Sequence, residues 1–137
     1  MEDHEFPVLE NIDAVPGWVW RSDNIVVERF VPERDGDLFV TRSWTFLGNA
    51  EHVLVRRSTD HVVKAANLSD EWFEESVPPS LRMLRDSLGF DFGKFDYVMH
   101  DGTPILLDAN RTPSMVPVTD RHPEIIGALA MGIEAFR

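Results

Sequence analysis

The sequence contains no cysteine, which excludes disulfide bonds and thiolate metal sites. It has only two lysines, Lys64 and Lys94, and acidic residues outnumber basic ones by 24 to 13. Nucleic-acid affinity comes largely from clustered basic side chains, so this composition argues against a nucleic-acid partner. Apolar runs fall far short of the ~20 residues that span a bilayer, and the acidic N-terminus lacks the pattern of a signal peptide. We therefore expect a cytoplasmic protein without a membrane partner.

Glycine is sparse as well. No two of the eight glycines lie closer than four positions apart, whereas a Walker A loop or a Rossmann fingerprint needs closer spacing. The five histidines are not spaced to place two metal ligands on one helix face, and we interpret them as surface or hydrogen-bonded residues. A self-contained nucleotide site of either common type is therefore excluded.

The remaining composition, with 43% hydrophobic residues, is that of an ordinary globular protein. Residues 1–24 mix acids with prolines and read as a loosely structured lead-in, and residues 25–137 read as one domain. Branched and aromatic residues predict an antiparallel meander. Its strands are expected at residues 25–31, 38–47, 51–58 and 62–66. Turns are expected at residues 34–37, around Gly36, and at Gly48 with Asn49.

At Leu68 the spacing of apolar residues changes from the alternation of a strand to the spacing of a helix. Ser69 followed by several acids predicts a helix N-terminus, and Gly89 predicts the end of that helix, with an interruption at the two prolines 78–79. Two further strands are expected at residues 90–100 and 104–110, and Pro123 begins a C-terminal helix. The predicted fold class is α+β, an antiparallel sheet with two helices.

The last two predicted strands have alternating faces. One face is apolar and should meet the core: it comprises Phe95, Tyr97, Met99, Ile105, Leu107 and Ala109. Both apolar sets reach one core only if Phe95 lies opposite Ala109 and Tyr97 opposite Leu107. That register predicts an odd-length turn centred on Gly102, rather than the two-residue turn that Asp-Gly favours.

The same register has a chemical consequence on the other face. It places Asp96 opposite Asp108, Lys94 opposite Asn110, and Val98 opposite Leu106. Opposed carboxylates with Cβ atoms ~5 Å apart repel each other unless a cation lies between them, and carboxylate and amide oxygens are ligands that Mg²⁺ prefers. The simpler interpretation is a solvated outer face of a hairpin, where acids are common.

Two stretches resemble a known family. DFGKFDYVMHDG at 91–102, followed by LLDANRTP at 106–113, resembles the closing signature of the ATP-grasp superfamily, which includes D-alanine–D-alanine ligases and biotin carboxylase. VVERFVPE at 26–33 resembles the hinge strand of that fold. The resemblance covers about residues 25–136 and implies the C-terminal lobe of such an enzyme.

The resemblance implies roles for individual residues and the cofactors ATP and Mg²⁺. Metal ligands would be Asp96, Asp108 and Asn110, with Asp108 standing where the family usually has Glu. Adenine would be received by Glu28 and by the backbone around Phe30 and Val31, with Val98 under its ring. Lys94, where the family usually has Arg, and Arg42 would face phosphate.

Two functions of different classes are expected. The first is part of an ATP-dependent ligase that activates a small carboxylic acid or amino acid as an acyl phosphate and joins it to an amine or thiol. The resemblance implies that a further lobe, or a second copy of the chain, completes the cleft. The second is a non-catalytic module that contacts other proteins, with Trp18, Trp20, Trp44 and Trp72 as candidate anchors. Tryptophans are, however, more often packed in the core than used as anchors.

Overall fold

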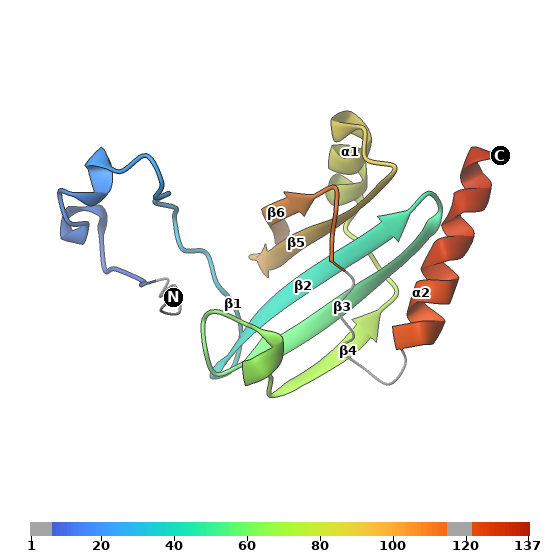
Figure 1. Cartoon of the computed structure of the whole chain (residues 1–137). Helices are drawn as coiled ribbons and strands as arrows, with labels where there is room; N and C mark the ends of the chain where they lie inside the picture. Colours follow the sequence, from blue (N-terminus) through green and yellow to red (C-terminus); the bar gives the residue numbers. More distant parts are fainter. Residues whose placement is uncertain (1–6, 115–121) are drawn as a thin grey trace. The chain divides into compact units, whose positions relative to one another are not determined.

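The computed structural model describes residues 7–114 and 122–137. The chain forms two compact units, Met1–Val31 and Pro32–Arg137. The first unit contains two short 3-10 helices, Ile12–Ala14 and Val19–Arg21. The second contains the sheet and both α-helices (Figure 1).

The second unit is built on an antiparallel sheet. Within the described residues it has six strands: β1 Glu33–Asp35, β2 Leu38–Leu47, β3 Ala50–Ser58, β4 Asp70–Glu74, β5 Phe92–His100 and β6 Thr103–Asn110. The order is β4-β3-β2-β5-β6, and β1 pairs with the start of β2. The predicted α+β class, an antiparallel sheet with two helices, is confirmed.

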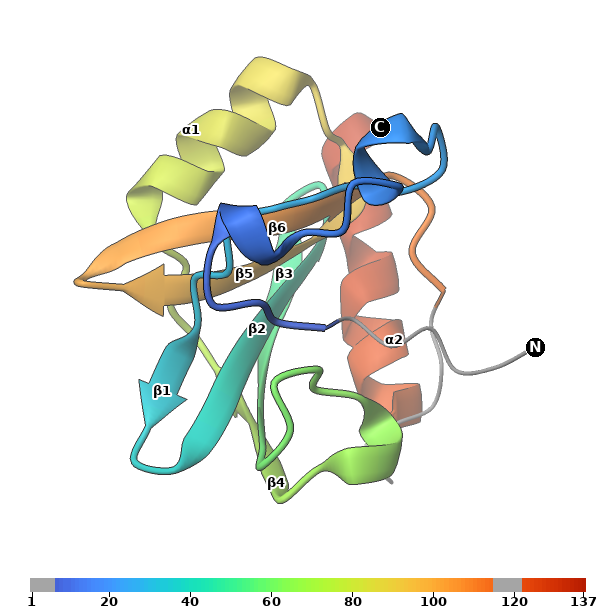
Figure 2. The ribbon, with the colours of Figure 1, turned by 90° about the vertical axis from the view of Figure 1, so that its left-hand side faces the viewer.

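The two helices cover opposite faces of this sheet. Helix α1, Pro79–Leu88, contributes Leu81 to the cluster around Trp44. Helix α2, His122–Ala130, continues as a 3-10 helix, Met131–Phe136, and contacts β3 and β2 from the other side. Figure 2 shows the two helices on either side of β2 and β3. Alternate residues of each strand therefore face different helices.

The core lies on the α1 side. Trp44 and Phe46 of β2 pack edge-on against Phe95 of β5, with ring centroids 5.6 and 5.3 Å apart. Around them are Val40, Val53, Val55, Val77, Leu81, Phe90 and Tyr97, all buried. The predicted burial of Phe95 and Tyr97 is confirmed. Trp44 belongs to the core and Trp72 packs against it, so neither is an exposed anchor.

The predicted strand at residues 25–31 is wrong, because these residues carry no strand. The short strand β1 takes the edge of β2 instead, with Glu33 opposite Val40 and Asp35 opposite Leu38. The turn predicted around Gly36 is present, so the hairpin exists with a shorter and later first strand. A run of strand-forming residues does not form a strand without a neighbouring one.

The predicted strand at 62–66 and the predicted helix start at Ser69 are also wrong. The Asn67 side chain accepts a hydrogen bond from the Lys64 N–H and donates one to the Val62 carbonyl, both at 2.8 Å, and this closes a loop. Strand β4 follows, where a helix was expected. Its acids bond to arginines across the sheet rather than to a helix dipole: Asp70 to Arg57, Glu71 to Arg56, and Glu74 to Arg42.

Helix α1 itself begins at Pro79, and Gly89 ends it in the left-handed conformation, with φ of 65°. Its end is therefore as predicted. The turn at Gly48 between β2 and β3 is also confirmed.

The final hairpin combines two registers. Asp101 and Gly102 form a two-residue turn, with φ of 49° and 75°, so the predicted odd-length turn is wrong. Next to this turn Tyr97 lies opposite Leu106, but further along Asp96 lies opposite Asp108 and Phe95 opposite Ala109. Leu107 is the additional residue of a β-bulge between these two parts.

The bulge corrects part of the predicted core face. Leu106 packs against the core, whereas Leu107 is 50% exposed and Ala109 is exposed too. The opposition of Asp96 and Asp108 is nevertheless as predicted, because the bulge lies between this pair and the turn.

Candidate functional site

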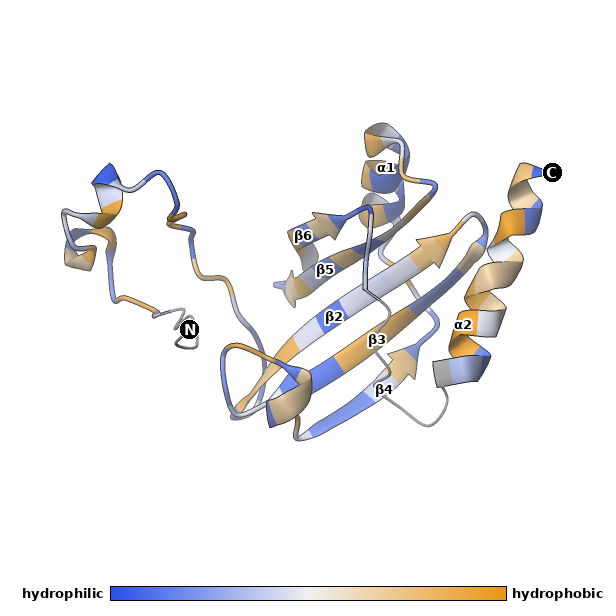
Figure 3. Cartoon of the chain, viewed as in Figure 1, coloured by the Kyte–Doolittle hydropathy of each residue, from blue (hydrophilic) through white to orange (hydrophobic). Residues whose placement is uncertain are grey.

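A row of polar side chains crosses the sheet face opposite the core. Asp96 of β5 lies between Ser43 of β2 and Asp108 of β6. In the next row, Lys94 lies between Thr45 and Asn110. In β2, apolar residues occupy both ends of the strand and more polar residues occupy its middle (Figure 3). We call Ser43, Lys94, Asp96, Asp108 and Asn110 the acid face.

Asp96 is the most highly coordinated side chain of the acid face. Its Oδ1 accepts a hydrogen bond from the Ser43 hydroxyl at 2.6 Å, and its Oδ2 lies 2.9 Å from the Lys94 ammonium nitrogen. Ser43 is buried, and the side chains of Lys94 and Asp96 are partly exposed. The carboxylate is thus held in place from one side and reaches solvent on the other. Ser43 was missed in the sequence, although its alternation with Trp44 places it on this face.

Asp108 and Asn110 complete the acid face from the edge strand β6. Asp108 is exposed, and Cβ atoms of directly opposed residues lie ~5 Å apart. The Asn110 Oδ1 accepts a hydrogen bond from the Thr112 N–H at 2.8 Å. The Thr112 hydroxyl donates a second, longer bond to the same oxygen at 3.5 Å, so a metal ion at this oxygen would replace that contact.

Val98 and Leu106, which were predicted to lie opposite each other beside the acids, do not share a face. Val98 is opposite Ile105 and is buried, and Leu106 turns to the core because of the bulge. The outer face therefore has Val98 beside the acids but not Leu106.

Arg42 lies on the opposite face from Asp96, because it precedes Ser43 on β2. Its guanidinium contacts Glu33 at 2.7 Å and Glu74 at 2.6 Å. The hydrogen bonds that Arg42 donates to Glu33 raise the pKa of Arg42 above its ordinary value, while burial raises the pKa of neighbouring Tyr97. The structure thus assigns Arg42 to an ion-pair cluster beside the core, away from the acid face.

The predicted adenine residues belong to the first unit, Met1–Val31. Glu28 and Phe30 are exposed there, and Val31 is partly exposed. These positions carry neither strand nor helix. The acid face belongs to the second unit, Pro32–Arg137.

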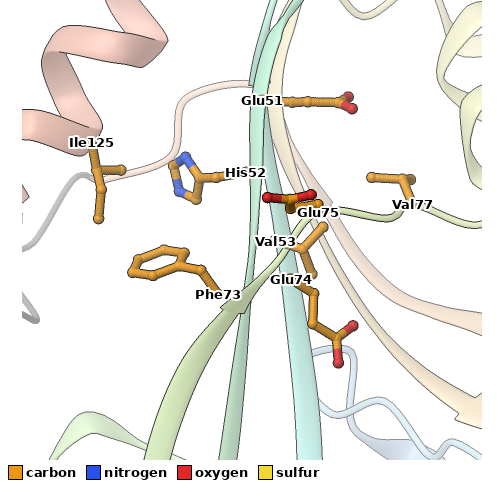
Figure 4. A pocket seen from close by; sticks show the side chains of 8 residues that line it. All are labelled: Glu51, His52, Val53, Phe73, Glu74, Glu75, Val77 and Ile125. Atoms are coloured by element: carbon orange, nitrogen blue, oxygen red, sulfur yellow. The ribbon is translucent and has the colours of Figure 1, made fainter.

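A cavity outside the predicted site lies where β3 continues past the end of β4. It has a volume of about 290 Å³. Figure 4 shows His52, Phe73 and Ile125 on one side of the strands and Val77 on the other. The His52 and Phe73 rings meet edge-on, with centroids 5.7 Å apart. Burial lowers the pKa of His52 below its ordinary value of 6.5. This cavity was not predicted from the sequence, because residues 70–74 were expected in a helix.

Comparisons with protein-family models, curated proteins and solved structures yield no match. Within the described residues, no three His, Cys, Asp or Glu side chains gather closely enough to hold a metal ion by themselves. Nor does any helix of that part of the chain have the length and apolarity needed to cross a membrane. The proposed function is therefore based on the acid face, which has two carboxylates and one amide.

Proposed function

We propose that the acid face binds Mg²⁺ together with the phosphates of ATP, as the C-terminal nucleotide-binding lobe of an ATP-grasp ligase. The observation that carries this proposal is the direct opposition of Asp96 and Asp108 on β5 and β6. Two like charges at opposed positions destabilise a sheet. Their presence is explained if a cation binds between them.

The residues of the acid face suit Mg²⁺ chemically. Asp96, Asp108 and Asn110 offer hard oxygen ligands, and Mg²⁺ is usually bound by one or two carboxylates together with substrate phosphates and water. Asp96 already contacts one cationic group, the Lys94 ammonium at 2.9 Å. These residues would hold Mg²⁺, and the metal would supply positive charge against the negative charge that develops during phosphoryl transfer.

Lys94 has the complementary role of an anion ligand. Its ammonium is partly exposed beside Asp96, and a lysine contacts phosphate as a point charge. When a divalent cation neutralises Asp96, the ammonium becomes available to a phosphate oxygen. Glu28, Phe30 and Val31 belong to the first unit and are not included in the proposed site. Arg42, which contacts Glu33 and Glu74, is left out as well.

The proposed reaction is the activation of a small carboxylic acid or amino acid. Its carboxylate oxygen attacks the γ-phosphorus of ATP, the bond to ADP breaks, and an acyl phosphate forms; an amine or thiol then displaces phosphate. The acid face supplies one wall of the site, and a further lobe or a second copy of the chain supplies the other. For the single chain we expect ATP affinity no tighter than roughly millimolar and no acid-dependent release of ADP.

Manganese binding tests this proposal, because bound and free Mn²⁺ are distinguished by electron paramagnetic resonance. Asp96→Asn and Asp108→Asn should each weaken Mn²⁺ binding by about tenfold or more, since each removes one of two anionic ligands. Asp101→Asn is the matched control: it removes one carboxylate at the hairpin turn, where Asn tolerates positive φ. Unchanged far-UV circular dichroism verifies folding. Equal Mn²⁺ affinity in the wild type and both acid-face variants would refute the site.

The alternative, a non-catalytic module that contacts another protein, is favoured by one observation. Trp18 and Trp20 are both more than half exposed, and exposed tryptophans are frequent anchors of protein interfaces. In that case the wild type and the three Asn variants would bind Mn²⁺ alike, and capture of a partner would depend on these two tryptophans.

A further inference from the structure

Asp96 has a cationic partner within the chain itself. The Lys94 ammonium nitrogen lies 2.9 Å from Oδ2 of Asp96. The two residues are two positions apart on β5, so both side chains lie on the same face of the sheet. The Ser43 hydroxyl donates a hydrogen bond to the other oxygen, Oδ1, at 2.6 Å. Both carboxylate oxygens are therefore engaged by the chain, one of them by a positive charge.

The Ser43 bond holds the carboxylate toward Lys94. Ser43 is buried, and a hydroxyl bond of this length to a carboxylate is of the strong, charge-assisted kind. Turning the carboxylate away from the ammonium would break that bond. Among the ion pairs of the described residues, Asp96 is the anionic partner of Lys94. The pair of Lys94 with Asp96 is thus the arrangement that an incoming cation meets.

A divalent cation on the acid face would compete with this ammonium. Mg²⁺ binds carboxylate oxygens at ~2 Å, and like charges a few ångströms apart repel each other. Asp96 and Asp108 together carry two negative charges, whereas Lys94 and a divalent cation carry three positive ones. A further negative charge is needed to balance them, and a phosphate oxygen beside the Lys94 ammonium supplies it.

We propose that Lys94 couples cation binding to anion binding on the acid face. Its ammonium competes with the divalent cation for Asp96, and a phosphate anion relieves this competition by binding the ammonium. This inference rests on the proposed function, because it assumes that Asp96 and Asp108 bind a divalent cation. It adds a form of regulation, in which the metal alone binds weakly and the metal and a phosphate compound bind together. By linkage, each ligand raises the affinity for the other by the same factor.

Lys94→Met tests this coupling, because methionine keeps an unbranched side chain and removes the charge. Electron paramagnetic resonance measures Mn²⁺ binding with and without inorganic phosphate at one fixed concentration, so the complexes that Mn²⁺ and phosphate form in solution are the same for every variant. Lys64→Met is the matched control. It removes the only other lysine, which is exposed in the loop between β3 and β4, and it changes the net charge equally.

The coupling predicts a pattern that a general change in charge does not produce. Phosphate should raise the Mn²⁺ affinity of the wild type and of Lys64→Met by about fivefold or more. Without phosphate, Lys94→Met should bind Mn²⁺ about fivefold or more tightly than the wild type does, because the competing ammonium is gone. Phosphate should then add little to the affinity of Lys94→Met. Matching circular dichroism spectra confirm that all three proteins are folded.

Failure of this inference is distinguishable from failure of the proposed function. If Asp96→Asn and Asp108→Asn weaken Mn²⁺ binding but Lys94→Met binds Mn²⁺ no more tightly than the wild type, the metal site stands and the competition is refuted. An equal gain in Lys94→Met and Lys64→Met also refutes it, because the gain would then come from the charge of the whole protein. If the wild type and both Asn variants bind Mn²⁺ alike, the proposed function fails, and the coupling fails with it.

Discussion

Truncating the neighbouring residues Leu106 and Leu107, one at a time, tests the β-bulge directly. The bulge turns Leu106 to the core and leaves Leu107 half exposed. A regular ladder with the odd-length turn would do the opposite, with Leu107 in the core and Leu106 outside. The two substitutions have identical chemistry and adjacent positions, so only the side-chain environment distinguishes them.

The magnitudes follow from burial. Replacing a fully buried leucine by alanine costs about 2–5 kcal/mol. Leu106 is only partly buried, so Leu106→Ala should cost about 2 kcal/mol, at the low end of that range. Leu107 keeps half of its surface in water, and Leu107→Ala should cost less than about 1 kcal/mol.

Urea denaturation followed by circular dichroism measures both values. The midpoint should fall more for Leu106→Ala, with similar slopes for both variants because neither changes the surface exposed on unfolding appreciably. A larger loss for Leu107→Ala would show that the ladder is regular. The bulge, and with it the account of how the acids face each other beside a two-residue turn, would then be rejected.

Two further predictions concern charged groups elsewhere in the sheet. Arg42→Met should destabilise the protein by about 2 kcal/mol or more, because it leaves Glu33 and Glu74 close together without their shared cation. Thermal unfolding measures this loss, and adding Glu33→Gln to Arg42→Met should recover part of it. A further loss of stability in the double variant would contradict the ion pairs. For His52, burial lowers the pKa in the folded state, so the unfolded chain binds a proton more readily. The free energy of unfolding should therefore fall as the pH drops below 6.5, and His52→Gln should flatten this part of the profile, which an unchanged slope would disprove.

Features that depend on residues close together in the sequence were predicted correctly. Gly48 and Gly89 end their elements through backbone conformations that other residues rarely adopt, and both were found from the sequence. The long strands β2 and β5 have enough branched and aromatic residues to be recognised without tertiary information. The α+β class follows from these elements.

The errors arise where distant residues decide the structure. Acids at residues 70–74 fit a helix N-terminus equally well, and only arginines on β3 and β2 hold them in a strand. Residues 25–31 have strand-like composition, but β1 takes the available edge of β2. Strand propensity reflects packing against neighbours, which one segment cannot reveal.

The candidate site was predictable in part for the same reason. Opposition of Asp96 and Asp108 follows from alternation on two adjacent strands, whereas the Ser43 hydroxyl on Asp96 requires knowing that β2 is the other neighbour of β5. Arg42 was misplaced because its face was never fixed by a strand register. Alternation determines which residues share a face only once the neighbouring strand is known.

The bulge at Leu107 also separates the tip of the hairpin from the acid face. The pairs next to the Asp101–Gly102 turn and the pair formed by Asp96 and Asp108 follow different registers, and an irregularity between them takes up a change of spacing. A tag, a label or a longer loop inserted at the tip can therefore be accommodated without moving the two carboxylates. The tip is the natural attachment point for probes that report on the acid face from a short distance.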